Sequence, residues 1–247
     1  MSFVLIAGLF LPLFPLGIGL NAALRGLGNP VARCALLLLW PQIGVAVLEA
    51  TQPAIPEGVV AWALLTSGLY ALRLLTVRDL GLWAGFLATS ALALTWGLAA
   101  AGASVTELRL FAFCFSLPSA LLTLLAGPLT ERFGAAYAGL HDGLAASLPR
   151  LSGVLVLTAL TAIATPPFPG FFAMLGLLHE LAWPAAPGVL LIWLTWGWAA
   201  TKLMQGFVFG AGRHSTLLDI GHASTLAYAA ALGAFAAAGL YLTGSVL

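Results

Sequence analysis

The stretch Thr165-Pro166-Pro167-Phe168-Pro169-Gly170 interrupts an apolar run that extends from Leu151 to Leu181. Its three prolines remove three backbone donors and disfavour helical geometry in the residues before them. At membrane depth, backbone groups without partners survive only where protein or water surrounds them. The run is therefore either two complete spans joined by a tight turn, or one crossing made of two half-helices with this stretch as its hinge.

The composition indicates that most of the protein lies in lipid. Of its 247 residues, 62% are apolar and 7% are charged. An average soluble domain has about a quarter charged residues and under half apolar ones. These values exclude a soluble enzyme, a nucleic-acid binder and a disordered protein. We expect an all-α fold, a polytopic membrane helix bundle that fills residues 1–247 as a single membrane domain.

Apolar runs comparable with the roughly 20 residues that a crossing needs recur along the whole chain. Counting the interrupted run once gives about eight crossings, one of them a discontinuous, proline-broken helix. The first run follows no basic segment and precedes no small-residue cleavage site, so we interpret it as a retained span and not a signal peptide. The runs are Phe3–Leu24, Ala35–Leu48, Val59–Val77, Leu80–Ala103, Leu108–Gly127, Leu151–Leu181, Gly188–Gly210 and Ile220–Thr243.

The distribution of basic residues favours the broken crossing, because Lys and Arg gather in cytoplasmic loops. With one broken crossing, eight of the nine basic residues fall on one side and Arg109 falls on the other. With two crossings in its place, Lys202 and Arg213 would change sides. We therefore predict a multi-pass protein of the bacterial inner (cytoplasmic) membrane with both termini non-cytoplasmic. The eight are Arg25, Arg33, Arg73, Arg78, Arg132, Arg150, Lys202 and Arg213.

Four segments follow one another in the order and spacing of one family of membrane subunits. Asp79-Leu80 follows a basic loop, and the break has the pattern Pro-x-x-x-Gly-Phe, which ends in Gly170-Phe171. The segments Trp198–Gly210 and Ile220–Thr243 come after it. The chain resembles the antiporter-like membrane subunits of complex I (NADH:quinone oxidoreductase) and of Mrp-type Na+/H+ antiporters.

This resemblance implies a domain organisation. Subunits of that family have fourteen helices, including two inverted five-helix repeats. The resemblance begins near Val59, and only a short loop separates Glu49 from Val59. We therefore expect a truncated member without the first repeat, in which residues 1–58 form two N-terminal helices, 59–212 the second antiporter-like repeat and 213–247 a C-terminal helix.

The resemblance also indicates a lost proton site. In the family, a titratable Lys or Glu follows the break in the pattern Gly-Phe-x-x-Lys/Glu. Counting from Gly170-Phe171 places Met174 at that position. Because a thioether neither takes nor gives a proton, we expect no autonomous proton pumping.

Three other residues are candidates for a residual proton path. Lys202 is the only lysine and lies inside an apolar run, so it is either a relay or ion-pair residue facing the bundle or a lysine that snorkels to the cytoplasmic interface. His179 and Glu180 are either the outer mouth of a half-channel or an interfacial polar pair.

The sequence predicts no cofactor, no metal site and no catalytic residues. Its two cysteines, Cys34 and Cys114, lie in apolar runs, and we interpret them as small buried hydrophobes. No nucleophile motif, phosphate loop, haem-ligand pair or dinucleotide fingerprint is present. The chain would at most be a subunit of a proton-translocating oxidoreductase (translocase).

The resulting hypothesis is a partly degenerate subunit of a proton-translocation module in a larger, complex I-like or Mrp-like complex, either respiratory or for inorganic-carbon uptake. It would dock and seal beside a full-length antiporter-like subunit, could contribute half a proton path, and could touch a soluble cytoplasmic subunit. The Trp193–Trp198 cluster is either a subunit interface or lipid-exposed. The alternative function is an independent ion or proton transporter that acts as a homodimer.

Overall fold

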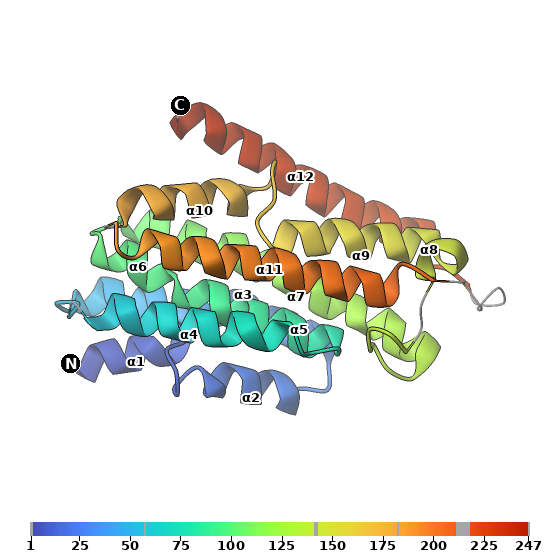
Figure 1. Ribbon diagram of the computed structural model, residues 1–247, viewed down its shortest axis with the longest axis horizontal. Coiled ribbons are helices and arrows are strands. Elements are labelled where there is room, and N and C mark those ends of the chain that lie inside the picture. The colour runs from blue at the N-terminus through green and yellow to red at the C-terminus, as the bar shows by residue number, and fades with distance from the viewer. Residues whose placement is uncertain (1, 57, 141–142, 182, 211–217, 247) are drawn as a thin grey trace.

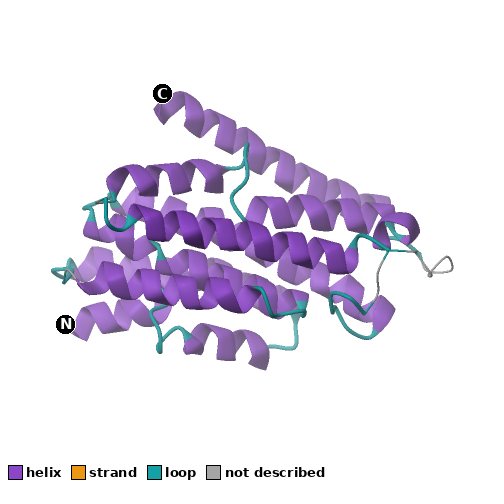
Figure 2. Ribbon diagram, viewed as in Figure 1, coloured by secondary structure: helices purple, strands orange, loops and turns teal. Residues whose placement is uncertain are grey.

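The computed structural model describes residues 2–56, 58–140, 143–181, 183–210 and 218–246, and its regular structure in these ranges is helical (Figures 1 and 2). Most helices run along the long axis of the molecule. They are α1 (Ser2–Phe10), α2 (Ile18–Gly26), α3 (Pro30–Thr51), α4 (Gly58–Leu74), α5 (Leu80–Ala93), α6 (Thr95–Ala100), α7 (Val105–Phe133), α8 (Leu144–Ser147), α9 (Pro149–Ala162), α10 (Pro169–Glu180), α11 (Ala186–Phe207) and α12 (His222–Val246).

Four helical segments of the described chain are long and apolar enough to cross a membrane on their own. They are Pro30–Thr51, the joined pair Leu80–Ala100, Val105–Phe133 and His222–Tyr241. Local signals set their ends: Asn29 caps α3, Asp79 caps α5, and Ser104 with Glu107 forms a capping box on α7. The all-α membrane helix bundle predicted from the sequence is confirmed.

The helices α9 and α10 form the predicted broken crossing. They have 14 and 12 residues, about 21 and 18 Å at roughly 1.5 Å per residue, so neither alone spans about 30 Å of hydrocarbon. Both pack against the single helices α7 and α12, which run past the break. Pro169 begins α10 at a position where the missing N–H costs nothing. The alternative of two complete crossings is wrong.

The first apolar run differs from its prediction as a single span. It forms two short helices, α1 and α2, separated by the segment Leu11–Gly17 with its two prolines, Pro12 and Pro15. The helix α3 contacts both parts. The protein therefore contains a second broken crossing, which the sequence analysis missed.

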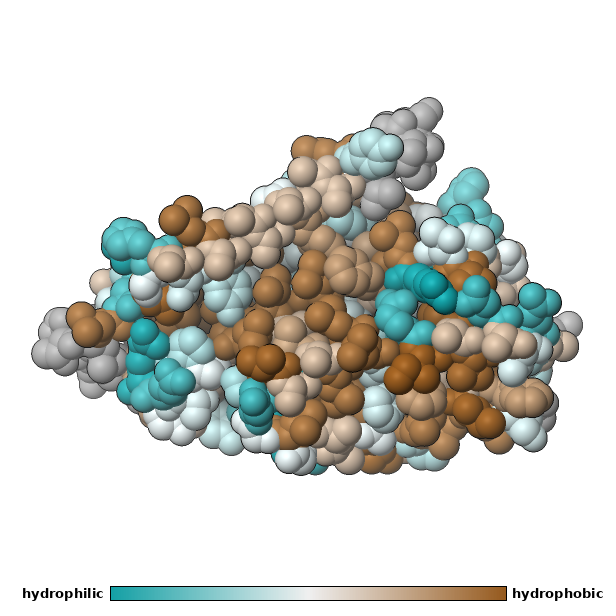
Figure 3. Space-filling model, turned by 180° about the vertical axis from the view of Figure 1, so that it is seen from behind, coloured by the Kyte–Doolittle hydropathy of each residue, from teal (hydrophilic) through white to brown (hydrophobic). Residues whose placement is uncertain are grey.

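Charged residues lie at the two ends of the bundle. One end, here called the basic end, holds the C-terminal ends of α2, α4, α7 and α11 together with the start of α3, α5 and α9 (Figure 1). The opposite end holds an ion pair of 2.6 Å between Arg109 and Glu49. Figure 3 shows this sorting on one face, where hydrophobic residues fill the middle and most hydrophilic ones gather toward the ends. The residues at the basic end are Arg25, Arg33, Arg73, Arg78, Arg132, Arg150 and, one turn and a half inside it, Lys202.

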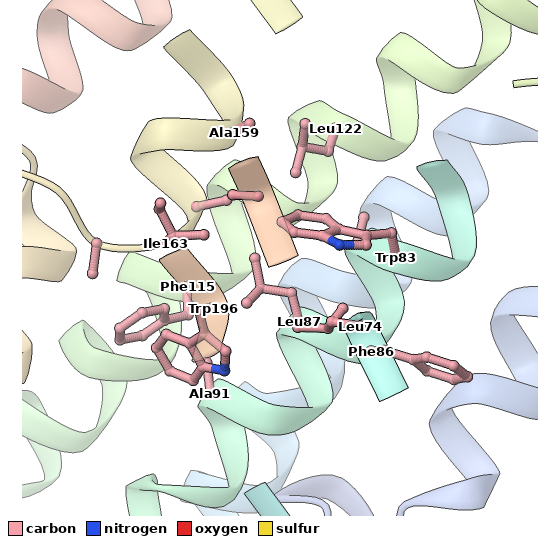
Figure 4. Packing of buried hydrophobic residues seen from close by; sticks show 14 of the residues in the cluster. Leu74, Trp83, Phe86, Leu87, Ala91, Phe115, Leu122, Ala159, Ile163 and Trp196 are labelled. Atoms are coloured by element: carbon pink, nitrogen blue, oxygen red, sulfur yellow. The ribbon is translucent and has the colours of Figure 1, made fainter. Parts of the chain in front are cut away.

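The core is centred on α5, which is buried on nearly all sides between α4, α7 and α2. Trp83 and Trp196 are fully buried, and Trp196 meets Phe115 edge to face at 5.7 Å between ring centroids (Figure 4). Such aromatic pairs add about 0.5–1.5 kcal/mol beyond their burial. This packing fixes the rotation of α11 about its axis, because Trp196 must face inward.

Candidate functional site

Lys202 lies on the outside of the bundle. It is exposed, and it shares one side of α11 with Leu194 and Trp198, which are 71% and 62% exposed. Its Nζ lies 5.9 Å from the centroid of the Trp198 ring, within the range of a cation–π contact. Of the two alternatives for Lys202, the outward direction within this chain agrees with the snorkelling one.

His179 and Glu180 are distant from Lys202. Both are exposed and end α10 at the end of the bundle opposite the basic end, whereas Lys202 lies toward the basic end of α11. The structure thus does not bring the three candidates into one site. Their role in a proton path stays a prediction.

Met174 is fully buried on α10. The position to which the resemblance assigns a titratable residue therefore faces the protein interior. In this chain it holds a thioether, which packs as an apolar side chain.

The buried polar side chains of the described residues are all amides or hydroxyls. No Lys, Arg, His, Asp or Glu is among them. The buried polar residues are Asn21, Thr66, Ser67, Thr89, Ser90, Thr95, Ser116, Ser119, Thr123, Ser152, Thr158 and Thr161.

Some of these polar groups join helices in small separate clusters. The amide of Asn21 donates to the Thr89 hydroxyl at 2.9 Å. Trp196 donates to the Ser90 hydroxyl at 2.9 Å, and that hydroxyl lies 3.1 Å from the Ser67 hydroxyl. Interhelical bonds of this kind average about 0.6 kcal/mol in membranes. They are suited to fixing helix positions.

Neighbouring helices supply hydrogen bonds to the backbone of the first break, residues 11–17. Indole groups of α4 and α6 donate to its carbonyls, an indole of α3 donates to a carbonyl in the last turn of α1, and a threonine of α4 accepts from it. The bonds are Trp96 to the Leu11 carbonyl (2.9 Å), Trp62 to the Phe14 carbonyl (2.6 Å), Trp40 to the Leu9 carbonyl (3.1 Å) and the Phe14 N–H to the Thr66 hydroxyl (3.0 Å).

The second break, residues 163–168, receives fewer hydrogen bonds from neighbouring helices. Trp193 of α11 donates to the Ile163 carbonyl at 2.9 Å, and the Thr165 hydroxyl donates to the carbonyl of Leu160 at 3.0 Å. Beside it lies an apolar groove of about 790 Å³, lined by the break and by residues of α11 that include Trp193 and Trp198. Below, this groove is called the α11 groove.

The sequence carried a signal for the first break that the analysis did not use. Pro12 and Pro15 precede Gly17 within a few residues, as the prolines of the second break precede Gly170. The run Phe3–Leu24 has the length of one straight span, so its length gave no reason to divide it.

Among the described residues, no group of three or more His, Cys, Asp or Glu could hold a metal ion.

No protein-family model and no curated protein matches the chain. Solved structures do. A chain of respiratory complex I from Thermus thermophilus, solved with bound NADH, aligns with a TM-score of 0.78 and 22% identity over 93% of this chain and 52% of its own length. A chain of the Mrp complex from Dietzia sp. DQ12-45-1b aligns with a TM-score of 0.77 and 16% identity over 96% of this chain and 55% of its own.

A chain of the membrane-bound sulfane sulfur reductase, an archaeal respiratory membrane complex, aligns with a TM-score of 0.78 and 14% identity over 96% of this chain and 51% of its own. The protein thus spans about half the length of the solved chains that it matches. It shares their fold, and the resemblance to subunits of complex I and Mrp complexes is confirmed at the level of the fold.

Proposed function

We propose that the protein is a non-catalytic membrane subunit of a complex I-like or Mrp-like assembly, which docks beside other membrane subunits and keeps the bilayer sealed against protons. The fold that it shares with chains of three membrane complexes supports the first part. The neutral interior of the described bundle carries the second part.

The argument for sealing rests on what a proton relay needs. Protons cross a membrane protein along ionisable side chains, backbone groups or waters within hydrogen-bond reach of each other, and such side chains are rare and functional at membrane depth. Here the buried polar clusters are uncharged, and fully buried Met174 occupies the position where the resemblance implies a titratable group. Among the described residues, no Lys, Arg, His, Asp or Glu is therefore buried between the two ends of the bundle.

Proton flux through the purified protein tests the sealing role. The full chain is reconstituted into liposomes that enclose a pH-sensitive dye, and a pH gradient with a valinomycin-clamped potential is imposed. We expect the same proton leak as in protein-free liposomes, because no relay crosses the bundle. A variant with a restored carboxylate, Met174→Glu, serves as the comparison. Flux above the protein-free rate in the unchanged protein would refute sealing and favour the independent transporter.

The docking role has its own test. Mild detergent extraction from the source cells and an affinity tag on this chain should recover it together with a second membrane subunit of the same fold, as the hypothesis of a full-length antiporter-like neighbour requires. A homodimer that purifies without other subunits would contradict docking and support the alternative function. The location in a bacterial inner membrane with both termini non-cytoplasmic belongs to the same proposal, and reporters fused to each terminus check it.

A half proton path through Lys202 remains a second candidate function. The observation that favours it is the place of Lys202 next to Trp198, which lines the α11 groove beside the helix break. Since Lys202 faces outward, such a path would run between this chain and a neighbouring subunit. In the intact complex, Lys202→Ala should then lower proton translocation, and Lys202→Arg should preserve part of it. Unchanged flux in Lys202→Ala would leave docking and sealing as the whole function.

A further inference from the structure

We infer that a pocket at the basic end, between α2, α3 and α5, binds the phosphate group of an anionic ligand. The pocket has a volume of about 200 Å³, and Arg25 and Arg33 line it together with Asp79. One water needs a cavity of about 10–15 Å³ measured in the same way. The pocket is many times larger, so a phosphate group has room. This site is independent of the proposed docking and sealing role.

The two arginines come from different helices and converge on one space. Arg25 lies in the last turn of α2, and Arg33 lies in the first turn of α3. A Cβ atom built on Gly81, at the start of α5, would lie 3.6 Å from the Arg33 Nη1 and 3.3 Å from the Asp79 Oδ1. The guanidinium of Arg33 therefore reaches the start of α5, and Gly81 keeps the space beside it open.

The guanidinium groups have capacity left for a ligand. Arg33 donates through its Nε to the Leu27 carbonyl at 2.5 Å, and within the described chain no hydrogen bond uses its Nη groups. Arg25 makes no hydrogen bond through its side chain to any described residue. No carboxylate of the described residues lies within 4.0 Å of either group. Guanidinium forks are well matched to phosphate oxygens.

The charge of the pocket selects an anion. Two guanidinium groups face one carboxylate, and that carboxylate is already used, because Asp79 Oδ1 accepts from the Leu82 N–H at 2.7 Å and caps α5. The N-terminus of α5 is thus capped by Asp79, and the two arginines supply the attraction for an anion. The remaining single positive charge matches a phosphodiester, which carries one negative charge.

The other lining residues fit a ligand with an apolar part. Leu24 and Leu82 flank the arginines, and Thr123 of α7 closes the inner side. An anionic phospholipid would place its phosphate on the arginines and the start of its chains against the leucines, as basic pockets between membrane helices do with lipid head groups. A free phosphate would use the arginines alone.

Binding of two probes tests the site in the full chain, purified in maltoside detergent and stripped of lipid. One probe is dioleoyl phosphatidylglycerol, titrated by native mass spectrometry against dioleoyl phosphatidylcholine. The other is inorganic phosphate against chloride at equal ionic strength. We expect Arg25→Gln to weaken binding about tenfold for whichever of the two probes the unchanged protein binds, as the loss of one charged hydrogen bond does. Arg25→Lys should weaken it less.

The matched control is Arg78→Gln, since Arg78 is exposed at the same end and does not line the pocket. Arg25 is the first choice for substitution because Arg33 also holds the Leu27 carbonyl. Phosphatidylglycerol binding that Arg25→Gln weakens and Arg78→Gln spares identifies a lipid site, and the same pattern with inorganic phosphate identifies a free-phosphate site. Binding of neither probe overturns the inference, and so does equal weakening by Arg25→Gln and Arg78→Gln.

Discussion

The crossing of α1 and α2 and the crossing of α9 and α10 both interrupt a helix at membrane depth, yet the surrounding helices treat the two interruptions differently. Three indoles and one threonine from neighbouring helices bond to the backbone at the first break. At the second break a single indole, that of Trp193, does so. Each break exposes two residues, Phe14 and Pro15 in the first and Pro166 and Pro167 in the second, and the second also borders the α11 groove.

One device is common to both breaks, namely a buried glycine on a single helix that passes close by. A Cβ on Gly44 of α3 would lie 2.8 Å from Leu11 Cγ and 3.1 Å from its backbone nitrogen. A Cβ on Gly239 of α12 would overlap the carbonyl oxygen of Pro167. The passing helix therefore approaches each break at backbone distance. The comparison teaches that both breaks are built into the packing, and that they differ in how many hydrogen bonds the neighbouring helices make to their backbone.

The largest expected effect comes from removing an indole at each break. Trp96→Ala removes a fully buried side chain and the donor to the Leu11 carbonyl, so we expect a loss of about 3–5 kcal/mol. Trp193→Ala removes a half-buried ring, for which about 1–2 kcal/mol is expected. Thermal unfolding in detergent, followed by dye labelling of the Cys114 thiol with the partly buried Cys34 replaced by Ala in every variant, measures both.

The phenylalanine variants separate packing from hydrogen bonding at these two positions. Trp96→Phe should recover most of the stability lost in Trp96→Ala, because the ring volume returns and only the donor is missing. If Trp193→Ala proves as costly as Trp96→Ala, both breaks depend equally on their indole donors and the difference between them is wrong.

The sequence predicted the second break because the apolar run that contains it is too long for one crossing. At about 1.5 Å per residue, a run of some 31 residues is too long for one straight crossing, so Pro166–Gly170 had to be a turn or a break. The distribution of the basic residues then favoured a break over a turn between two spans. The 22-residue run at the N-terminus fits one crossing, and Pro41, Pro118 and Pro128 show that a proline alone does not break a helix here. Pro12 and Pro15 therefore did not by themselves predict a break in the first run.

The direction of Lys202 was also beyond the sequence. The rotation of a helix about its axis depends on its neighbours: Gly188 of α11 lies against Leu64 of α4, and Trp196 fills the core. Those contacts turn Lys202 outward. The neutral interior, in contrast, follows from a composition of 7% charged residues, because few ionisable groups exist to be buried.

An intermediate effect is expected from filling the space at the two glycines. Alanine favours a helix over glycine by about 1 kcal/mol, but at Gly239 and Gly44 its methyl group would displace the break, at a cost of about 1–3 kcal/mol. We expect Gly239→Ala to be the more destabilising, because its Cβ would overlap a backbone oxygen, whereas the nearest atoms at Gly44 belong to the side chains of Leu11 and Phe10. Gly233→Ala on α12 is the control, since a Cβ there meets nothing within 4 Å and should stabilise. Unfolding temperatures that rise in all three variants would contradict the close approach.

The smallest effect concerns one hydroxyl at each break. Thr66 donates to the Trp62 carbonyl and accepts from the Phe14 N–H. Thr66→Val leaves that N–H without its acceptor, so we expect a loss near the average of about 0.6 kcal/mol for membrane hydrogen bonds and up to about 1.7. The Leu160 carbonyl, by contrast, also accepts from the Thr165 N–H at 3.2 Å, so Thr165→Val should change stability by less than Thr66→Val. Thr66→Ser, which keeps the hydroxyl, should lie close to the unchanged protein. A larger loss in Thr165→Val than in Thr66→Val would mean that the second break depends on its own side chain more than the first depends on its neighbours.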